Sequence, residues 1–193
     1  MGRYNQRMPI PPKILARRST RLSRPIRTEQ LDLEFSNGAR RTYERRLDTG
    51  HGAVIIVPMR DADTVLLIRE FAAGMEHYEL GLPKGRLDAG ESAFDGANRE
   101  LKEEAGFGAR RLDALGRLSL APAYMSHLTD IVLARELYPE RLEGDEPEEM
   151  EVVPWKLSEL HALMARPDVT AARTVAALSM AREYLAGRYR VPA

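Results

Sequence analysis

Residues 85–107, with the sequence GRLDAGESAFDGANRELKEEAGF, decide how the rest of this 193-residue chain is interpreted. The glycines near the start allow a tight loop, and Glu91 and Ser92 then suit the exposed N–H groups and the dipole at a helix entrance. The helix is expected to run to Ala105 and to stop at Gly106. On a helical wheel of about 100° per residue, one face is apolar and consists of Phe94, Ala97, Leu101 and Ala105. We therefore expect this helix to pack on a sheet.

A second face of the same helix is acidic, because spacings of three and four residues bring Glu100, Glu103 and Glu104 together. Such a cluster is costly unless protons or cations neutralise it, and a hard divalent cation with oxygen ligands does this directly. Mg²⁺ also shares its coordination shell with substrate phosphates, which would place a pyrophosphate and an attacking water at the cluster. The alternative interpretation of an E-x-x-E-E group is a solvated helix face. Arg99 is expected to pair with Glu91 and to fix the loop against the helix.

Short apolar or alternating runs on both sides of this helix predict strands, and periodic runs near the C-terminus predict two more helices. The expected strands are 31–35, 41–46, 53–58, 64–68, 78–82, 112–120, 128–134 and 152–155, and the expected helices are 157–164 and 168–184. Asn37-Gly38 favours a hairpin turn between the first two strands. The apolar stripe of the last helix is expected at Val169, Ala172, Val175, Ala176 and Met180. This order of elements indicates an α/β sandwich.

Composition excludes several classes of function. Lys plus Arg and Asp plus Glu each number 29, so the formal net charge is zero, which disfavours bulk attraction to nucleic acid or to an anionic membrane. There is no cysteine, which excludes disulfides, thiolate metal sites and a cysteine nucleophile. No apolar run reaches the length of a membrane span and the N-terminus lacks a secretory signal, so we expect a cytoplasmic protein. The basic segment 1–28 and the acidic segment 143–151 are interpreted as a solvated tail and loop.

The full spacing of residues 85–107 resembles the signature of the Nudix hydrolase superfamily, G-x5-E-x7-R-E-U-x-E-E-x-G-U, in which U is a bulky apolar residue. Every defined position is filled, by Gly85, Glu91, Arg99, Glu100, Leu101, Glu103, Glu104, Gly106 and Phe107. The fixed spacing of so many positions makes the match far more specific than a lone glycine motif. The resemblance implies an α/β/α sandwich with a mixed β-sheet, preceded here by an N-terminal antiparallel β extension.

The resemblance also implies roles for the residues of this signature. Glu100, Glu103 and Glu104 would be catalytic and would bind one or more Mg²⁺ or Mn²⁺ ions, with help from the backbone carbonyl of Gly85. The structural residues of the signature would be Glu91, Arg99 and Gly106. Water would attack phosphorus, and no covalent intermediate is expected.

Segments along most of the chain, including LEFSNGARRTYER, LIREFAAG and LYPERLEGDEPE, resemble the bacterial ADP compounds hydrolases, a group near the ADP-ribose pyrophosphatases. The implied reaction cleaves the pyrophosphate bond of ADP-ribose, diadenosine polyphosphates or NADH to AMP and a second phosphorylated product. Two features depart from relatives. The arginine of the E-Q-[FI]-R element is replaced by Ala72, which leaves Arg69 as a substitute phosphate contact. The S-Q-P-W-P-x-P-x-S array of dedicated NADH pyrophosphatases is absent, so NADH would be one substrate among several.

Further site residues are expected outside the signature. The resemblance places the general base in the acidic loop LEGDEPEEMEVV, where Glu146 and Glu148 are candidates and a solvated loop is the alternative. The expected substrate contacts are Arg69, Glu79, Pro122 and Tyr124. Pro122 occupies a place that is typical of ADP-ribose-cleaving relatives. Trp155 is interpreted as a packing residue, with stacking on adenine as the alternative.

We expect three parts in the chain: an N-terminal arm and β-hairpin at 1–48, a Nudix domain at 49–187, and a C-terminal tail at 188–193. By resemblance, the N-terminal part would be a dimerisation element and the protein a homodimer that binds a small nucleotide. Two other functions stay open on the sequence alone. One is a non-catalytic Nudix module that senses a nucleotide, and the other is a pyrophosphohydrolase that acts on RNA 5′ ends.

Overall fold

The computed structural model of the chain describes residues 28–47 and 50–191. The part of the expected N-terminal arm up to residue 27, residues 48 and 49, and the last two residues of the expected tail lie outside this range. Among the described residues, no helix is long and apolar enough to cross a membrane.

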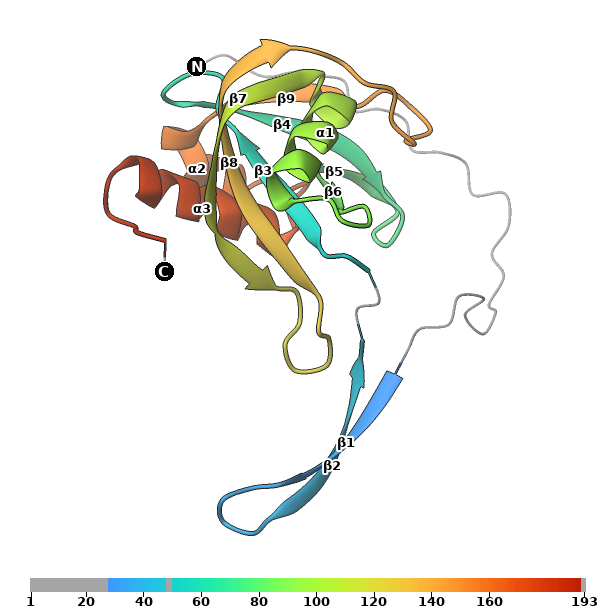
Figure 1. Cartoon of the computed structure of the whole chain (residues 1–193). Helices are drawn as coiled ribbons and strands as arrows, with labels where there is room; N and C mark the ends of the chain where they lie inside the picture. Colours follow the sequence, from blue (N-terminus) through green and yellow to red (C-terminus); the bar gives the residue numbers. More distant parts are fainter. Residues whose placement is uncertain (1–27, 48–49, 192–193) are drawn as a thin grey trace.

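The body of the protein contains two β-sheets that lie between helices (Figure 1). The larger sheet has the order β6-β3-β8-β7, with bounds Lys84–Arg86, Ala53–Pro58, Leu128–Pro139 and Phe107–Ser119. The smaller sheet has the order β5-β4-β9, with bounds His77–Gly81, Thr64–Ala72 and Glu151–Lys156. Strands β3 and β8 are parallel, whereas the other pairs are antiparallel. The prediction of a mixed sheet is therefore confirmed.

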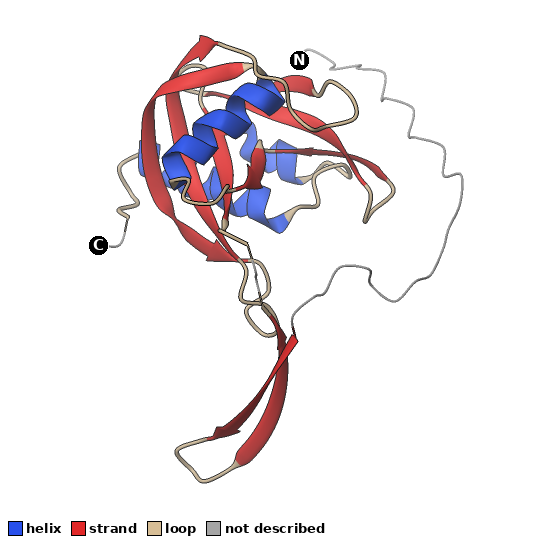
Figure 2. Cartoon of the chain, turned by 45° about the vertical axis from the view of Figure 1, so that its right-hand side comes forward, coloured by secondary structure: helices blue, strands red, loops and turns tan. Residues whose placement is uncertain are grey.

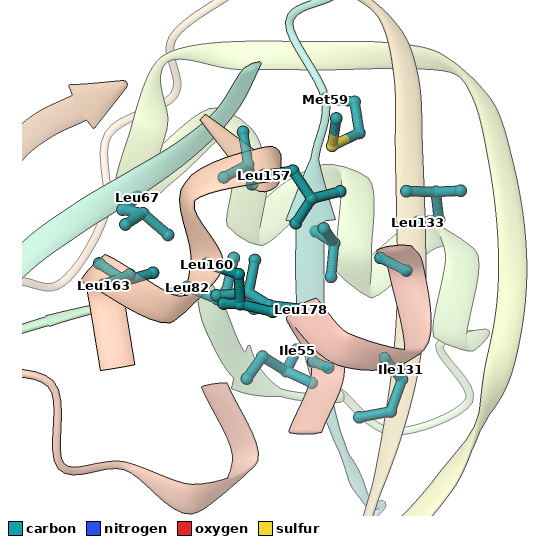
Figure 3. Packing of buried hydrophobic residues seen from close by; sticks show 14 of the residues in the cluster. Ile55, Met59, Leu67, Leu82, Ile131, Leu133, Leu157, Leu160, Leu163 and Leu178 are labelled. Carbon is teal, nitrogen blue, oxygen red and sulfur yellow. The ribbon is translucent and has the colours of Figure 1, made fainter. Parts of the chain in front are cut away.

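Strand β3 separates two hydrophobic cores, because its six consecutive buried residues alternate between its two faces. Ile55 and Val57 join the core under the C-terminal helices α2 (Leu160–Met164) and α3 (Ala172–Leu185), where Leu82, Leu160 and Leu178 meet (Figure 3). Val54 and Ile56 join the core under α1 (Ala93–Ala105), with Ala97, Leu101 and Ala105. The helices thus cover opposite faces of the larger sheet (Figure 2), which confirms the α/β/α sandwich.

The N-terminal hairpin projects away from the body of the protein (Figure 1). It consists of β1 (Thr28–Glu34) and β2 (Arg40–Arg46), which are antiparallel and form a sheet of their own. Its contact with the body includes Arg46, whose backbone bonds to the loop between β7 and β8. Leu33, Phe35 and Tyr43 leave large apolar side chains exposed on the hairpin. The predicted antiparallel extension is therefore present, and among the described residues no further named strand joins its two-stranded sheet.

Several boundaries and faces differ from the sequence prediction. Helix α3 begins at Ala172 and not at Asp168, and a 3₁₀ turn at Leu157–Glu159 precedes α2. The predicted stripe of α3 is right in part, since Val175 and Met180 pack against the core and Val169 is buried just before the helix. The fully buried residues of the helix are instead Thr174, Ala177, Leu178 and Ala181. On α1, Phe94 is exposed although it was expected to pack on the sheet. Strand β6, only three residues long, was not predicted.

Candidate active site

The helix α1 is fixed at both ends by local chemistry. Ser92 is the N-cap residue, and its hydroxyl accepts a hydrogen bond from the backbone N–H of Asp95 at 3.1 Å. Gly106 ends the helix in the left-handed conformation, with φ of 75°, and its N–H bonds back to the last turn. These caps set the length of α1, so that its acidic face lies beside the short strand β6.

Arg99 connects the loop before α1 to the acidic face of the helix. Its guanidinium makes two hydrogen bonds of 2.9 Å to Glu91, and its Nη2 also donates to the backbone carbonyl of Arg86. Its Nη1 donates to Glu100 at 2.9 Å and to Glu103 at 3.0 Å. One arginine therefore holds the loop and partly neutralises two of the three carboxylates of the predicted cluster, and these contacts raise its pKa.

The backbone of Gly85 forms a cradle for the Glu100 carboxylate. A Cβ atom at this position would lie 1.9 Å from the carboxyl carbon of Glu100 and 2.2 Å from Oε2. Only glycine leaves room for this approach, since two non-bonded heavy atoms need more than about 3 Å between them. Glu100 is buried, and its burial raises its pKa above the ordinary value.

Glu104 is the most deeply buried acid of the cluster, at 6% exposure. Its Oε2 accepts a hydrogen bond of 2.9 Å from the backbone N–H of Lys84. Burial raises the pKa of Glu104 to about 8, against the opposing effect of the Lys84 side chain. Two of the three carboxylates are thus desolvated, so the interpretation of this face as a solvated one is wrong.

The acidic loop lies across from these glutamates. One cavity of about 400 Å³ is lined by Glu100, Glu103 and Glu104 together with residues 141–150. A second cavity of about 580 Å³ joins the same three glutamates to residues 84–86 of β6 and to Glu146. Cavities of this size accommodate small-molecule ligands. The structure therefore brings the predicted cluster, Gly85 and the loop with the predicted base together around one cleft.

The two candidates for the general base differ in their surroundings. Glu148 accepts a hydrogen bond of 2.5 Å from the hydroxyl of Tyr78, and this bond raises the pKa of Tyr78. Glu146 lines both cavities, and partial burial, with the nearby charges of Glu70 and Asp145, raises its pKa. A raised pKa brings a carboxylate closer to the value that suits proton transfer near neutral pH.

The roles of Glu70, Tyr78 and Lys84 were not predicted from the sequence. The ammonium of Lys84 pairs with Glu70 on β4, directly beside Glu104. Tyr78 lies on β5 and contacts Phe71 edge to face, which directs its hydroxyl to the acidic loop. Both contacts depend on the pairing of β4 with β5 and on the position of β6, for which no local pattern in the sequence gives a signal.

The structure does not support two of the expected substrate contacts. Arg69 is 4% exposed, and its guanidinium pairs with Asp168 at 2.8 Å and Glu151 at 2.9 Å. A buried arginine between two carboxylates is a structural element, so it is not free to bind a phosphate. Glu79 accepts two hydrogen bonds from Thr170, which joins β5 to the segment before α3.

The other two expected substrate contacts lie in the loop between β7 and β8. Pro122 and Tyr124 are both exposed, and the backbone carbonyl of Tyr124 accepts a hydrogen bond from Arg46 of the hairpin. Neither residue lines the two cavities that contain the glutamate cluster. Within one chain the structure therefore separates this loop from the cluster.

The residues of the cluster fit a hard divalent cation by their chemistry. All the candidate ligands are oxygen atoms, two of the carboxylates are desolvated, and Gly85 keeps the space beside Glu100 free of a side chain. In the structure, however, Arg99 and the Lys84 backbone hold these carboxylates, so no three Asp, Glu or His side chains of the described residues are arranged around one metal position.

Comparisons with known proteins agree with this geometry. Residues 49–178 match the NUDIX domain, and residues 12–45 match the NudE-type Nudix hydrolase N-terminal domain. The chain is 52% identical over 180 residues to the ADP compounds hydrolase NudE of Escherichia coli (strain K12), covering 93% of this chain and 96% of that protein. It is 29% identical over 149 residues to an ADP-ribose pyrophosphatase of Bacillus subtilis (strain 168), covering 76% and 80%. A solved crystal structure of an ADP compounds hydrolase matches with a TM-score of 0.79 and 52% identity, over 94% of this chain and 98% of that one. The chain is therefore a member of the Nudix hydrolase family.

Proposed function

We propose that this hydrolase cleaves the pyrophosphate bond of ADP-containing compounds, namely ADP-ribose, diadenosine polyphosphates and NADH, and releases AMP and a second phosphorylated product. One observation carries the proposal. Glu100, Glu103 and Glu104 face an acidic loop across a cleft, beside a glycine that leaves room for a carboxylate. The similarity to the ADP compounds hydrolase supports the choice of substrate class.

Hydrolases of this family generally depend on a divalent metal ion. We assign Mg²⁺ to this chain, with Mn²⁺ as a substitute, and we assign its ligands to the three glutamates and the backbone carbonyl of Gly85. When bound, such an ion would neutralise the diphosphate and polarise the attacked phosphorus and the attacking water.

The acidic loop would supply the group that removes a proton from the attacking water. We assign this role to Glu146, because it lines both cavities with the cluster and its pKa is raised. Glu148 is the second candidate, and Tyr78 would hold it in place. Lys84 lines the same cleft, where its ammonium is within reach of an anionic substrate once the ligand competes with Glu70.

The assay for this proposal incubates the full chain with ADP-ribose and Mg²⁺ and follows AMP by chromatography. Glu100→Gln should lower kcat by at least about a hundredfold, since it removes a charged ligand of the metal ion that would act on the reacting phosphate. Glu183→Gln is the matched control, because Glu183 lies on α3, across the sheet from α1, and should leave the rate unchanged. Equal rates for the two variants would refute the assignment of the site.

The assay also separates the alternative functions. A nucleotide sensor would bind ADP-ribose in calorimetry and release no AMP at any metal concentration. An RNA 5′-end hydrolase would release pyrophosphate from triphosphorylated RNA faster than it cleaves ADP-ribose. Either result would overturn the proposed substrate class, and product analysis in ¹⁸O-labelled water would identify the phosphorus that water attacks.

The pH dependence distinguishes the two candidate bases. At saturating Mg²⁺, Glu146→Gln should lower kcat by about a hundred- to a thousandfold and remove the part of the acidic fall in rate that comes from the base, since the attacking water would no longer depend on that carboxylate being deprotonated. Glu148→Gln should preserve that acidic limb. The opposite pattern would transfer the role of base to Glu148.

We further propose that residues 1–48 form a dimerisation element, residues 49–187 the catalytic domain and residues 188–193 a tail. The hairpin supports a homodimer, because an isolated two-stranded sheet is marginal in water and this one exposes Leu33, Phe35 and Tyr43. Light scattering should give twice the mass of the chain, and Phe35→Ser should shift the protein toward monomer. A monomeric wild-type protein at micromolar concentration would contradict the proposal. We also propose a cytoplasmic location, where nucleotides of this class are present.

A further inference from the structure

Another cavity, with a different chemistry from the glutamate cleft, lies at the end of the smaller sheet where β4 begins and β9 ends. It has a volume of about 470 Å³ and is lined by Arg60, Thr64, Pro154, Trp155, Lys156, Glu159 and Arg166. Its volume lies within the usual range for small-molecule sites. Among the described residues, β9 pairs only with β4, so the cavity opens along a free sheet edge.

The charge of this cavity is opposite to that of the glutamate cleft. Three cations line it, Arg60, Lys156 and Arg166, against the single carboxylate of Glu159. Lys156 donates to the neutral hydroxyl of Thr64 at 3.0 Å and has no carboxylate within ion-pair distance among the described residues. Arg60 is half-exposed and lies 3.9 Å from Asp61, which gives it little stabilisation. Asp168, which pairs with Arg166, and Asp61, which lies near Arg60 and Lys156, do not line the cavity, so the balance of charge among the lining residues favours an anionic ligand.

Arg166 is oriented toward the cavity by its other contacts. Its Nε and Nη2 donate to the two carboxyl oxygens of Asp168 at 2.8 and 2.7 Å, which fixes the plane of the guanidinium. Its Nη1 has no hydrogen-bond acceptor among the described residues. Because Asp168 fixes Nε and Nη2, the Nη1 amino group remains available to a ligand, and a planar guanidinium is well suited to bind a phosphate.

Trp155 supplies an aromatic surface in the same cavity. The guanidinium of Arg166 lies 5.6 Å from the centre of its indole ring, and its Nε1 donates to the backbone carbonyl of Glu159 at 3.3 Å. The side chain is half-buried, so part of the ring is open to a ligand. Aromatic rings next to arginine and lysine form the usual platform for a nucleobase with its phosphate.

We propose that this cavity is a second nucleotide site, which binds a nucleoside 5′-monophosphate with its base against Trp155 and its phosphate between Lys156, Arg60 and Arg166. A monophosphate fits better than a metal-bound polyphosphate, because the cavity lining contains only one carboxylate and offers no set of metal ligands. The site does not depend on the hydrolytic reaction, and it is separate from the cleft. Lys156 and Glu151 occupy opposite ends of β9, and five residues of strand span roughly 17 Å.

Binding at this site would act on a run of ion pairs that leads to the acidic loop. Arg166 bonds to Asp168, Asp168 bonds to Arg69, and Arg69 bonds to Glu151, which directly follows the loop. A ligand that engages Arg166 therefore contacts the first member of a network that ends at Glu151, five residues after the proposed general base Glu146 in the sequence. This arrangement gives the second site a route to influence the rate of the first.

The single tryptophan of the chain makes the proposal directly testable. The protein is titrated with AMP in the presence of a chelator, with excitation at the red edge of tryptophan absorption, where adenine does not absorb. We expect the fluorescence emission of Trp155 to change saturably as AMP is added. Lys156→Glu should weaken the midpoint by about tenfold or more, since it replaces a charge-assisted contact with repulsion. Arg166 is not the residue to vary, because its loss would disturb the pair with Asp168.

Controls distinguish recognition of a nucleotide from weaker explanations. Arg117→Gln removes an exposed arginine that lines no part of this cavity, and it should leave the titration unchanged. Adenosine, which lacks the phosphate, and ribose 5-phosphate, which lacks the base, should both need at least tenfold higher concentrations than AMP. The proposal is overturned if AMP leaves the emission unchanged at millimolar concentration, if Lys156→Glu titrates like the wild type, or if adenosine binds as well as AMP. Lys156→Glu should also retain the wild-type rate with ADP-ribose when no AMP is added.

Discussion

Replacing Gly85 with alanine is a sharp test of the active site, because it adds one methyl group at the point where the chain approaches the Glu100 carboxylate. The new Cβ would lie 1.9 Å from both the carboxyl carbon and Oε1 of Glu100. Ordinary contacts of this kind are about 3.5 Å long, so the carboxylate would have to move by roughly 1.5 Å. Such a displacement of a metal ligand in the site lowers an enzymatic rate by about a hundredfold. We therefore expect kcat/KM for ADP-ribose to fall by about this factor in Gly85→Ala.

The stability of Gly85→Ala should change much less than its activity. The backbone of Gly85 is not in the left-handed region, so alanine adopts its conformation without strain, and the smaller entropy of the unfolded chain contributes about 0.4–1 kcal/mol of stability. Against this, Glu100 would lose its bond to Arg99, which costs roughly 1–3 kcal/mol. The free energy of unfolding should therefore decrease by no more than about 2.6 kcal/mol, and the fold should be retained.

Steady-state kinetics at several Mg²⁺ concentrations, together with urea unfolding, separates these two effects. The activity should recover only in part at high Mg²⁺, because the displaced ligand weakens metal binding as well as positioning. Gly74→Ala is the matched control, since no atom lies within 4 Å of the added Cβ and the backbone is again not left-handed. A Gly85→Ala variant with the activity and metal dependence of the wild type would show that the position of the Glu100 carboxylate does not matter for the reaction.

Three further changes test other parts of the structure. In metal-free protein the pKa of Glu104 is about 8, above its value in the unfolded chain, so the free energy of unfolding should fall as the pH rises from about 5 to 8. Glu104→Gln should remove most of this fall, which is on the order of 4 kcal/mol. The prediction would be contradicted if the unfolding free energies of the two proteins changed equally between about pH 5 and 8. Arg69→Met leaves Glu151 without its arginine partner and Asp168 with Arg166 alone, and it should cost about 3 kcal/mol in urea unfolding, whereas a loss below about 0.5 kcal/mol would mean that the buried network is not structural. Tyr78→Phe should cost about 1 kcal/mol in stability and, by loosening the acidic loop, lower kcat by about three- to tenfold; an unchanged kcat would separate Tyr78 from catalysis.

The parts of the fold that could be predicted from sequence are those with a local cause. Strand β3 has the predicted bounds, 53–58, because six consecutive apolar residues can only be buried between two layers. The C-terminal end of α1 at Ala105 is also as predicted, since Gly106 provides the usual stop signal. The acidic face of α1 follows from the helical period alone.

The errors arise where distant segments decide the outcome. Arg69 looked like a free cation beside the predicted site, but Asp168, which is 99 positions further along the chain, buries and pairs it. The stripe of α3 was counted from Val169, which is buried but lies before the helix. Thr170 is bound to Glu79 before the helix begins, so the predicted stripe extended beyond the start of α3 and missed the fully buried Ala177 and Leu178.

The position of Arg99 explains why the spacing around it is informative. Glu91 takes Nε and Nη2 of the guanidinium, which fixes its plane and leaves Nη1 directed at both Glu100 and Glu103. The same side chain can therefore keep the loop in place through one edge while the other edge serves as an internal counter-ion for the carboxylates. A competing cation needs to displace only the contacts of Nη1, and the bidentate pair with Glu91 continues to hold the loop. Lysine has no such fork, because a single ammonium cannot fix its own orientation through one carboxylate and neutralise two others.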